Sequence, residues 1–390
     1  MTGDGLGIVE RGAVRVRDGW IAEVGAGPLA ASPGETEVDC RGCVVMPGFV
    51  DPHTHLVFGG WRADEFEMRL SGKSYKEIAL AGGGILSTVN ATRVASEEEL
   101  FKRALARLRE MVSWGTTTVE AKSGYGLDTE TELKMLCVAG LLSEEELATV
   151  VPTFLGAHSV PAGTPKPAYI DLLETEMIPA AAGQGIARFI DVFCENFVFN
   201  AVESTRILEA GKRHGLLATV HADEIESSGG AETAARVGAV SASHLLQPSE
   251  AGLRAMAEKG VVAVLLPGTC FFLREAHRSP VRRMRELGIV MALATDFNPG
   301  SCTMLAQPLT VQFGCIYYGL TPVEALRGVT VNAARALKLD GELGTLEPGR
   351  RADIVVTDVP SWQHLAYRLG HNPVRLTIRH GKVVANNRTA

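Results

Sequence analysis

The sequence predicts an α/β protein, a (β/α)8 barrel of the TIM type with a small discontinuous β-domain. Three observations support this prediction. Short apolar runs alternate with helical patterns along the middle of the chain, polar residues follow these runs, and both ends of the chain read as short strands with turn glycines. A length of 390 residues fits one barrel plus an accessory domain or two to three average domains. The predicted fold class therefore rests on the alternation of strand and helix patterns and not on the length of the chain.

Eight candidate strands form the predicted barrel, and each is an apolar or β-branched run that ends in polar residues. They are Val44–His55, Thr116–Ser123, Val151–His158, Phe189–Glu195, Ala218–Asp223, Ser241–Leu245, Val261–Leu266 and Val290–Asp296. Segments with helical spacing separate many of them. These are Glu97–Trp114, Glu130–Leu142, Ala201–His214, Gly229–Val237, Pro248–Glu258 and Ser279–Leu287. In such a parallel barrel the catalytic residues lie at the carboxyl ends of the strands.

The two ends of the chain have a different pattern. Ala13–Gly25, Ala352–Asp358 and Val374–Val384 are short alternating strands with turn glycines. We expect them to pair into one β-sandwich-like domain made of residues 1–47 and 344–390. The barrel, residues 48–343, would be inserted between its halves.

Composition excludes some classes of function. With 46% hydrophobic and 21% charged residues and a net charge of −7, the chain has no basic footprint for nucleic acid. It contains neither a secretion signal nor about 18 consecutive apolar residues, so we expect a cytoplasmic protein without membrane contact. Seven scattered cysteines read as reduced thiols. The C-x-x-C pair Cys40 and Cys43 leaves a redox pair or half of a zinc site open.

The strongest local signal is the segment Pro47–His55, in which an apolar run ends in H-x-H. Positions two apart on an extended strand face the same side, so His53 and His55 can direct both imidazoles at one ion. Two solvated histidines at a strand end are the alternative. That alternative loses weight because His221, His244 and Asp296 also follow predicted strands. Each could singly be a core histidine or a capping aspartate, but together they suffice for a metal site with open coordination positions.

This arrangement resembles the amidohydrolase superfamily, which has H-x-H after strand one, histidines after strands five and six, and aspartate after strand eight. The segment Gly344–Val356 is similar to the passage by which these proteins return from the barrel to the β-domain. Binuclear members bridge two metals with a carboxylated lysine at the end of strand four, where this chain has Phe193-Cys-Glu195. The resemblance therefore implies one Zn²⁺ or Fe³⁺ per chain. Its ligands would be His53, His55, His221 and Asp296.

Further segments resemble the branch of the superfamily that opens a five-membered cyclic amide carrying a propionate. They are Phe58–Arg62, Ser71–Tyr75, Ala81–Ile85, Lys122–Gly126, Leu155–His158 and His221–Glu224. This resemblance implies a small-molecule substrate, a homodimer and a set of substrate contacts. The contacts would be Arg62, Tyr125, His158, Glu224, Asn298, Gly300 and Ser301. Two departures are Trp61, where the family usually has asparagine, and a start close to the first strands, from which we expect a leading strand of the family to be missing.

The residue chemistry fits such a substrate. Arg62 offers a planar fork for a carboxylate, although an arginine in a loop is more often a solvated surface residue. Tyr125 lies between two glycines and could either contact the ring or only cap the barrel. Glu224 could serve the reaction or cap the following helix. His158 could be a satisfied core histidine, but its place past a strand end favours function.

The expected mechanism is hydrolysis by a water that a single metal activates. His244 and the metal would stabilise the oxyanion of the tetrahedral intermediate. Asp296 or Glu224 would accept the proton of the water and return it to the ring nitrogen, so that the C–N bond breaks. One alternative is another cyclic amidase or a ring deaminase of the same superfamily, and the carboxylate fork disfavours the deaminase. The other alternative is a non-catalytic barrel with a structural metal. A closed structural site would not need surplus acid–base groups.

Overall fold

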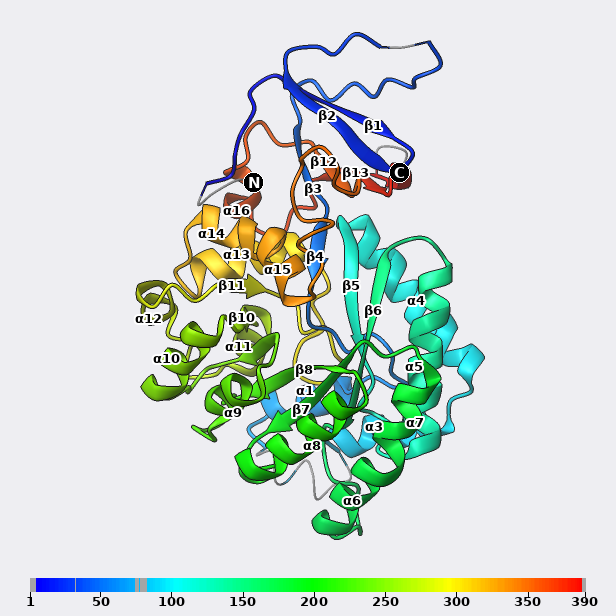
Figure 1. The fold of residues 1–390 in the computed structure, drawn as a ribbon, viewed down its shortest axis with the longest axis vertical. Helices are drawn as coiled ribbons and strands as arrows, with labels where there is room; N and C mark the ends of the chain where they lie inside the picture. The colour runs from blue at the N-terminus through cyan, green and yellow to red at the C-terminus, as the bar shows by residue number, and fades with distance from the viewer. Residues whose placement is uncertain (1–4, 32, 74–76, 78–82, 388–390) are drawn as a thin grey trace.

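The computed structural model describes residues 5–31, 33–73, 77 and 83–387, and an eight-stranded parallel sheet lies at its centre (Figure 1). Neighbours in the sheet follow chain order from β4 to β11, and every strand pair is parallel. The strands are β4 (Phe49–Asp51), β5 (Thr116–Lys122), β6 (Thr149–Ala157), β7 (Phe189–Cys194), β8 (Leu217–Ala222), β9 (Ser241–His244), β10 (Val262–Leu265) and β11 (Met291–Leu293). This order confirms the predicted barrel.

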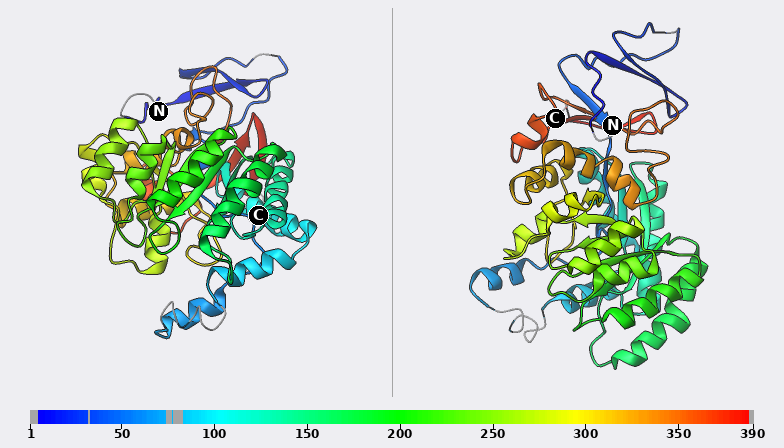
Figure 2. Two further views of the ribbon diagram at one scale, coloured as in Figure 1. Left: turned by 60° about the horizontal axis from the view of Figure 1, so that its bottom comes forward. Right: turned by 60° about the vertical axis from the view of Figure 1, so that its left-hand side comes forward.

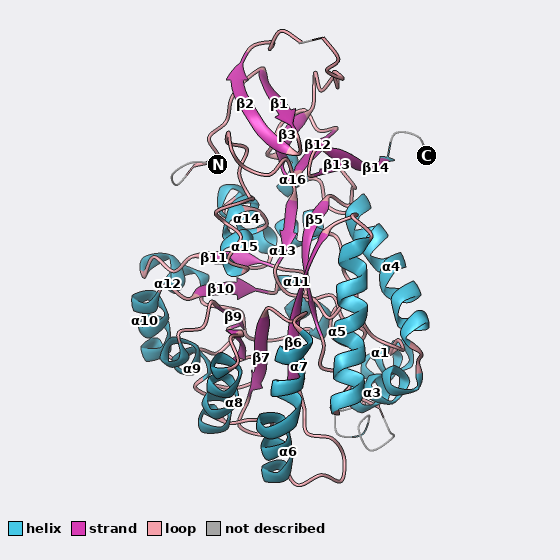
Figure 3. Ribbon diagram, turned by 45° about the vertical axis from the view of Figure 1, so that its right-hand side comes forward, coloured by secondary structure: helices cyan, strands magenta, loops and turns pink. Residues whose placement is uncertain are grey.

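Helices connect the strands and cover the outside of the barrel (Figures 1 and 3). Those between β4 and β7 are α1 (Ala63–Leu70), α3 (Ile85–Val94), α4 (Glu97–Ser113), α5 (Thr129–Glu144), α6 (Lys166–Leu172), the π-turn η1 (Leu173–Met177) and α7 (Ile178–Gln184). Those that follow are α8 (Ala201–Arg213), α9 (Gly230–Val237), α10 (Glu250–Lys259), α11 (Pro267–Leu273), α12 (Val281–Glu286), α13 (Gln307–Ile316), α14 (Pro322–Gly328), α15 (Val331–Ala336) and α16 (His364–Tyr367).

Local sequence explains where several helices begin. At the start of α4, the Ser96 side chain accepts from the Glu99 backbone N–H, while the Glu99 carboxylate accepts from the Ser96 N–H. Asn200 and Glu203 form the same reciprocal box at α8. Such boxes satisfy backbone donors that have no partner within the helix. Among the described residues, no helix combines the length and the apolar character needed to cross a bilayer.

The first and last strands of the barrel meet through a few backbone contacts rather than a long ladder. Thr54 and Phe297 form an isolated parallel bridge, in which the His55 N–H donates to the Phe297 carbonyl at 2.9 Å. The Asp296 N–H donates to the His53 carbonyl at 3.0 Å. The side chain of Asp51 accepts from both the backbone N–H and the hydroxyl of Thr295, at 3.1 and 2.6 Å. The seam of the barrel is therefore closed beside the predicted metal ligands.

One predicted strand was wrong, because the run Val44–His55 is divided between two sheets. Its first part, β3 (Val44–Pro47), pairs antiparallel with β12 (Ile354–Thr357) in a four-stranded sheet. The chain then passes Gly48, where a Cβ atom would lie 2.3 Å from the Thr117 hydroxyl oxygen, and enters the barrel as β4. The close approach of Thr117 requires glycine at this crossing.

The terminal segments form two sheets rather than one ladder. The four-stranded sheet has the order β14-β13-β12-β3, with β13 (Val374–Arg379) and β14 (Lys382–Asn386) forming a hairpin. A separate hairpin, β1 (Gly12–Arg17) and β2 (Trp20–Ala26), lies against it (Figure 2). The Ile21 N–H donates to the Arg350 carbonyl at 2.8 Å, and Ile21, Ala352 and Ile354 share a small apolar core. The division into domains at residues 47–48 and 343–344 stays a prediction.

Two apolar clusters stabilise the barrel. The larger joins the outer faces of the strands to the helices. The smaller joins Val50, Phe189, Val262 and Ala292, on four barrel strands, to residues of α15. The seven cysteines, all of them among the described residues, form no disulfide, and Cys43 donates its backbone N–H to the Cys40 carbonyl at 3.0 Å.

Candidate active site

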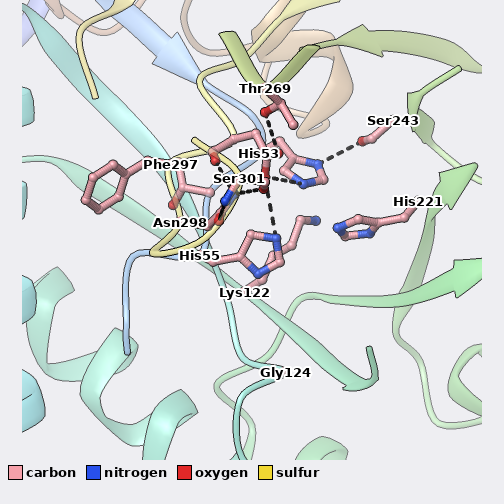
Figure 4. A network of polar contacts seen from close by, with 12 residues as sticks. His53, His55, Lys122, Gly124, His221, Ser243, Thr269, Phe297, Asn298 and Ser301 are labelled. Atoms are coloured by element: carbon pink, nitrogen blue, oxygen red, sulfur yellow. Dashed lines mark hydrogen bonds and ion pairs between the residues drawn. The ribbon is translucent and has the colours of Figure 1, made fainter. Parts of the chain in front are cut away.

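Three of the predicted metal ligands converge at the carboxyl ends of the barrel strands. His53, His55 and His221 each offer a ligand atom, these atoms lie within 4.8 Å of one another, and all three residues are buried. The Asp296 Oδ1 atom lies 3.4 Å from His53 Nε2 and 3.7 Å from His55 Nε2. Figure 4 shows the three imidazoles turned toward a common space. The structure thus brings together all four residues that the sequence suggested as ligands.

Several residues at these strand ends have unusual backbone conformations. Asp223, His244 and Asp296 have positive φ angles of 51°, 69° and 52°. Residues other than glycine seldom adopt this left-handed region, and such backbone strain concentrates at functional sites. Asp223 follows β8 directly, His244 is the last residue of β9, and Asp296 is the third residue after β11.

The histidines have the properties that a metal ion requires. The Nε2 atoms of His53 and His221 are buried without a hydrogen-bond partner, which would be costly unless a ligand satisfied them. Burial lowers the pKa of His53 and of His55 well below the ordinary value, helped by neighbouring cationic groups. These imidazoles are therefore neutral, which is the form that donates a lone pair to a metal. Together with the carboxylate of Asp296, they fit a divalent or trivalent ion.

The other ring nitrogens of two ligands contact polar side chains. His53 Nδ1 hydrogen-bonds with the Ser243 hydroxyl at 2.9 Å. His221 Nδ1 lies 3.0 Å from Asp191 Oδ2, although the ring N–H is not aimed straight at that oxygen. The Thr269 hydroxyl donates to Asp296 Oδ2 at 2.6 Å. Such outer contacts orient metal ligands.

The sequence did not single out these outer residues. Asp191 lies within the apolar run FIDVFC, and Ser243 and Thr269 are small polar residues without a motif. A charged residue inside an otherwise apolar strand was the one available signal. It could have shown that Asp191 has a partner within the barrel, since buried carboxylates are rarely left unpaired.

Glu224 and His244 lie side by side next to this cluster, with the Glu224 Oε1 and His244 Nδ1 atoms 3.5 Å apart. Burial raises the pKa of Glu224 well above its ordinary value, and the nearby carboxylates of Asp296 and Glu195 add to the shift. Burial and His221 lower the pKa of His244 well below its ordinary value. These shifts favour the protonated form of Glu224 and the uncharged form of His244.

Glu224 does not cap the following helix. The carboxylate that accepts from the first N–H groups of α9 belongs to Asp223, at 3.0 Å from Gly230 N and 2.9 Å from Ala231 N. The Glu195 carboxylate holds the same loop from the other side, because it accepts from the Ile225 N–H at 2.9 Å and from the Ser228 hydroxyl at 2.6 Å. Asp223 and Glu195 together fix the loop that carries Glu224.

Tyr125 and His158 form one wall of the site. The His158 ring stacks on His55 at a centroid distance of 4.9 Å, and its Nδ1 atom hydrogen-bonds with the Gly124 carbonyl at 3.0 Å. The Tyr125 ring is buried, and its centroid lies 5.5 Å from that of His55 and 5.3 Å from that of His158. Its loop is held by Glu132, whose carboxylate accepts three backbone N–H groups at 2.7–2.8 Å. Tyr125 therefore faces the candidate ligands.

Arg62 lies just before α1 and is not a freely solvated arginine. Its Nε atom is buried without a partner, and its guanidinium lies against Gly300. A Cβ atom at Gly300 would lie 1.4 Å from Arg62 Nη2, so this approach requires glycine there. The Gly300 carbonyl in turn accepts from Arg69 Nη2 at 3.0 Å. Arg62 is thus placed beside the loop that follows Asp296.

The Asn298 amide is engaged within that loop. Its Oδ1 atom accepts from the backbone N–H groups of Gly300 and Ser301 at 2.8 and 2.7 Å. Its Nδ2 atom donates to the Asp296 carbonyl and the Ser301 hydroxyl, each at 2.7 Å. Asn298 therefore shapes the loop that carries Asp296, and a direct substrate contact by Asn298 stays a prediction. Of the sequence segments noted above, Ser74, Tyr75, Ala81 and Gly82 lie outside the described residues.

Comparison with known proteins gives a consistent result. The amidohydrolase family matches residues 44–384. An imidazolonepropionase from Geobacillus sp. (strain WCH70) is 49% identical over 98% of this chain and 92% of its own length. The imidazolonepropionase of Symbiobacterium thermophilum is 47% identical over 97% and 91%.

Solved structures share the fold. A zinc-bound adenosine deaminase from Xanthomonas campestris superimposes with a TM-score of 0.73 at 19% identity, covering 97% of this chain and 89% of that one. A 5-methylcytosine deaminase from Klebsiella pneumoniae gives 0.72 at 21% identity, covering 96% and 95%. At these identities the superpositions show a common fold and not a common substrate.

Proposed function

The chain belongs to the amidohydrolase family and, within it, to the imidazolonepropionases, and from this membership we infer the reaction that it catalyses. It hydrolyses the cyclic amide C–N bond of 4-imidazolone-5-propanoate to N-formimidoyl-L-glutamate, a step of histidine degradation. The observation in the fold that carries this conclusion is the convergence of three buried histidines and Asp296 beside the Glu224–His244 pair.

We propose that one Zn²⁺ or Fe³⁺ is held by His53, His55, His221 and Asp296. Unpaired Nε2 atoms on two of the histidines support this assignment. The engagement of Glu195 with the loop of Glu224 supports a single ion, because that carboxylate is already bonded. When bound, such an ion acts as a Lewis acid toward the ring carbonyl and lowers the pKa of a coordinated water.

The chain's own residues would move the protons. In the proposed reaction Asp296 takes a proton from the attacking water, whose oxygen forms a bond to the ring carbonyl carbon. The neutral His244 imidazole donates a hydrogen bond to the carbonyl oxygen as negative charge develops there. Burial raises the pKa of Glu224 and so favours its protonated form, from which it can deliver a proton to the ring nitrogen as the C–N bond breaks. The proton on Asp296 then restores Glu224 to its acid form.

The substrate contacts remain part of the proposal. Arg62 would hold the propionate by a charge-assisted fork, while Tyr125 and His158 line the ring. Backbone and hydroxyl groups of Gly300 and Ser301 would complete the pocket, and Asn298 would contact the substrate or fix their loop. The unpaired Nε atom of Arg62 supports its role, because a buried guanidinium donor without a partner is available for an anion.

We also propose a cytoplasmic homodimer. The lack of a disulfide among the seven cysteines fits a reducing compartment. Large apolar side chains are exposed on α1, which projects from the barrel (Figure 2), on α11, α13 and α16, and just after α16. They are Phe66, Phe271, Ile316, Tyr367 and Leu369. Protein interfaces commonly bury exposed apolar surface. Light scattering of the purified protein would measure the mass, and a monomer at all concentrations would contradict the dimer.

A spectrophotometric assay tests the function directly. Purified protein with its metal content measured should consume 4-imidazolone-5-propanoate and release N-formimidoyl-L-glutamate. Guanine provides the comparison, because a ring deaminase would release ammonia from it. Turnover of guanine without turnover of the imidazolone would overturn the proposed function.

A further inference from the structure

Asp191 lies in the middle of β7, where a carboxylate is unexpected, and contacts a candidate metal ligand. Its side chain is 1% exposed. The Oδ2 atom lies 3.0 Å from His221 Nδ1 and also accepts from the Lys122 ammonium at 2.7 Å. The Oδ1 atom accepts from the backbone N–H groups of Val192 and His221, at 2.7 and 3.2 Å. Asp191 therefore contacts both the ring and the main chain of His221.

Neighbouring strands hold the carboxylate in place. Lys122, at the end of β5, donates to Asp191 and also to Glu120 Oε1 at 2.7 Å. The Thr153 hydroxyl on β6 donates to the same Glu120 oxygen at 2.5 Å. Four adjacent strands thus share one buried network, and Figure 4 shows Lys122 directed toward the histidine cluster. A carboxylate held from so many sides cannot easily turn away from His221.

We propose that Asp191 is a positioning residue that keeps the proton of His221 on Nδ1 and presents the Nε2 lone pair to the metal ion. Each ring nitrogen of a neutral histidine is either donor or acceptor, so a carboxylate at Nδ1 fixes the tautomer. A charged partner also makes the opposite nitrogen a stronger ligand. The inference rests on the metal site of the proposed function. His53 has the neutral Ser243 hydroxyl at the equivalent nitrogen, so the anionic partner distinguishes His221 from His53.

Exchange of Asp191 for asparagine is the sharpest test. Both carboxylate oxygens face only donors, so an amide group must turn its NH2 either toward Lys122 and His221 or toward two backbone N–H groups. The apparent Zn²⁺ affinity of Asp191→Asn, measured by competition with a chromogenic chelator, should fall roughly 10- to 100-fold. The visible spectrum of the Co²⁺-loaded variant should also differ from that of the parent.

Glu132→Gln is the matched control. Glu132 is equally buried and accepts three backbone N–H groups, but its contacts serve the loop of Tyr125 rather than a ligand. Its Zn²⁺ affinity and Co²⁺ spectrum should equal those of the parent. If both variants lose affinity equally, the effect is a general one on the barrel, and the proposal is overturned. It is also overturned if Asp191→Asn binds Zn²⁺ as the parent does.

A measurement on the parent protein covers the case in which Asp191→Asn does not fold. Nitrogen-15 NMR of metal-free, histidine-labelled parent should show His221 protonated on Nδ1, with the signal assigned from its loss in His221→Gln. Protonation on Nε2 instead would refute the proposal. If the parent itself did not bind Zn²⁺, the metal site of the proposed function would be refuted. If the parent bound Zn²⁺ but His221 were protonated on Nε2, only the proposed role of Asp191 would be refuted.

Discussion

Glu224 is a partly buried carboxylate and Asp296 a buried one at the candidate site, and they have different surroundings. Asp296 lies against two histidine ring nitrogens, whereas Glu224 lies against His244. Glu224→Gln should therefore keep its metal yet lose roughly a hundredfold or more in kcat, the scale for removing a positioned acid or base. Asp296→Asn should weaken metal binding as well, because an anionic ligand becomes neutral. Metal content and kcat, measured on both variants, distinguish these roles.

The pH dependence of Glu224→Gln provides a check on the same residue. The protonated form of Glu224 predominates below its raised pKa and is lost as the pH rises through that value. If Glu224 donates a proton, kcat of the parent should fall on the alkaline side, and the glutamine variant should lack this limb. A metal-replete glutamine variant with near-parental turnover would leave the proton transfers to Asp296 and His244.

Arg62 and Gly300 allow a paired prediction about substrate affinity. Removing a charge-assisted contact costs about 2–3 kcal/mol, so Arg62→Ala should lower kcat/KM roughly 30- to 150-fold, mainly through KM. Arg62→Lys should rescue only part of this loss, because an ammonium lacks the planar fork. Gly300→Ala should also raise KM, since its Cβ would displace the guanidinium.

The double variant then tests the link between these two residues. With Arg62 already alanine, Gly300→Ala should cost little more, because the group that it displaces is absent. Additive losses in the double variant would show that Gly300 acts independently of Arg62. An unchanged KM for Arg62→Ala would mean that the propionate is bound elsewhere.

Among single residues, the sequence predicted those that form a spaced motif or that follow the end of a strand. The H-x-H pair, His221, Asp296 and Glu224 meet as expected, because parallel strands bring their carboxyl ends to one face. Asp191 and Ser243 could not be predicted as partners of the histidines, since their contacts depend on the register between neighbouring strands. The spacing of residues within one strand does not determine its register with a strand that is far away in the sequence.

Among the elements, the loop between β8 and α9 is held by carboxylates on both sides, and this leads to a prediction for Glu195. Glu195→Ala removes the contacts with Ile225 and Ser228 that fix the loop of Glu224. We expect kcat to fall about ten- to a hundredfold, because small displacements of a catalytic group are costly. The metal content should stay at the parental level.

Glu195→Gln is the control, because its amide oxygen can still accept from Ile225 while its NH2 group donates to the Ser228 hydroxyl. Its kcat should lie nearer that of the parent. Loss of metal in Glu195→Ala would instead identify Glu195 as a ligand, in the place where binuclear relatives use a carboxylated lysine.

Elements with strong periodic patterns were predicted well, and the rest depended on tertiary context. The helix predicted at Glu97–Trp114 is observed at Glu97–Ser113, where the capping box marks its start. The prediction of one strand at Val44–His55 was wrong, because this continuous apolar run contributes a strand to each of two sheets. The run divides at Gly48, where the backbone closely approaches Thr117. Helices α1, α3, α6, α7, α11 and α13 to α16 were not among the helical segments named from the sequence. Several of these are short and owe their stability to packing on the barrel.

For the whole molecule, the barrel seam and the candidate metal site are the same place. His53 and His55 follow β4, Asp296 follows β11, and the backbone bonds between these segments close the barrel. Asp51 adds a side-chain link across the seam to Thr295. The alternation of strands and helices predicted a closed barrel, but it could not show that so few contacts join the first and last strands.

Because its proposed ligands come from both sides of this seam, the metal should stabilise the entire barrel. An ion that binds only the folded chain adds about 2.7 kcal/mol when its concentration is a hundred times Kd. With an unfolding entropy of about 2.1 cal/mol/K per residue, that raises Tm by roughly 3 °C for a chain of 390 residues. In calorimetry, removal of the metal by a chelator should lower Tm by this amount, and added Zn²⁺ should restore it. His221→Asn should have a lower Tm that Zn²⁺ hardly changes, because β8 would no longer be tied to the seam. An equal Tm for the metal-free and metal-loaded parent would show that the backbone contacts at Thr54 and Phe297 close the barrel without help from the ion.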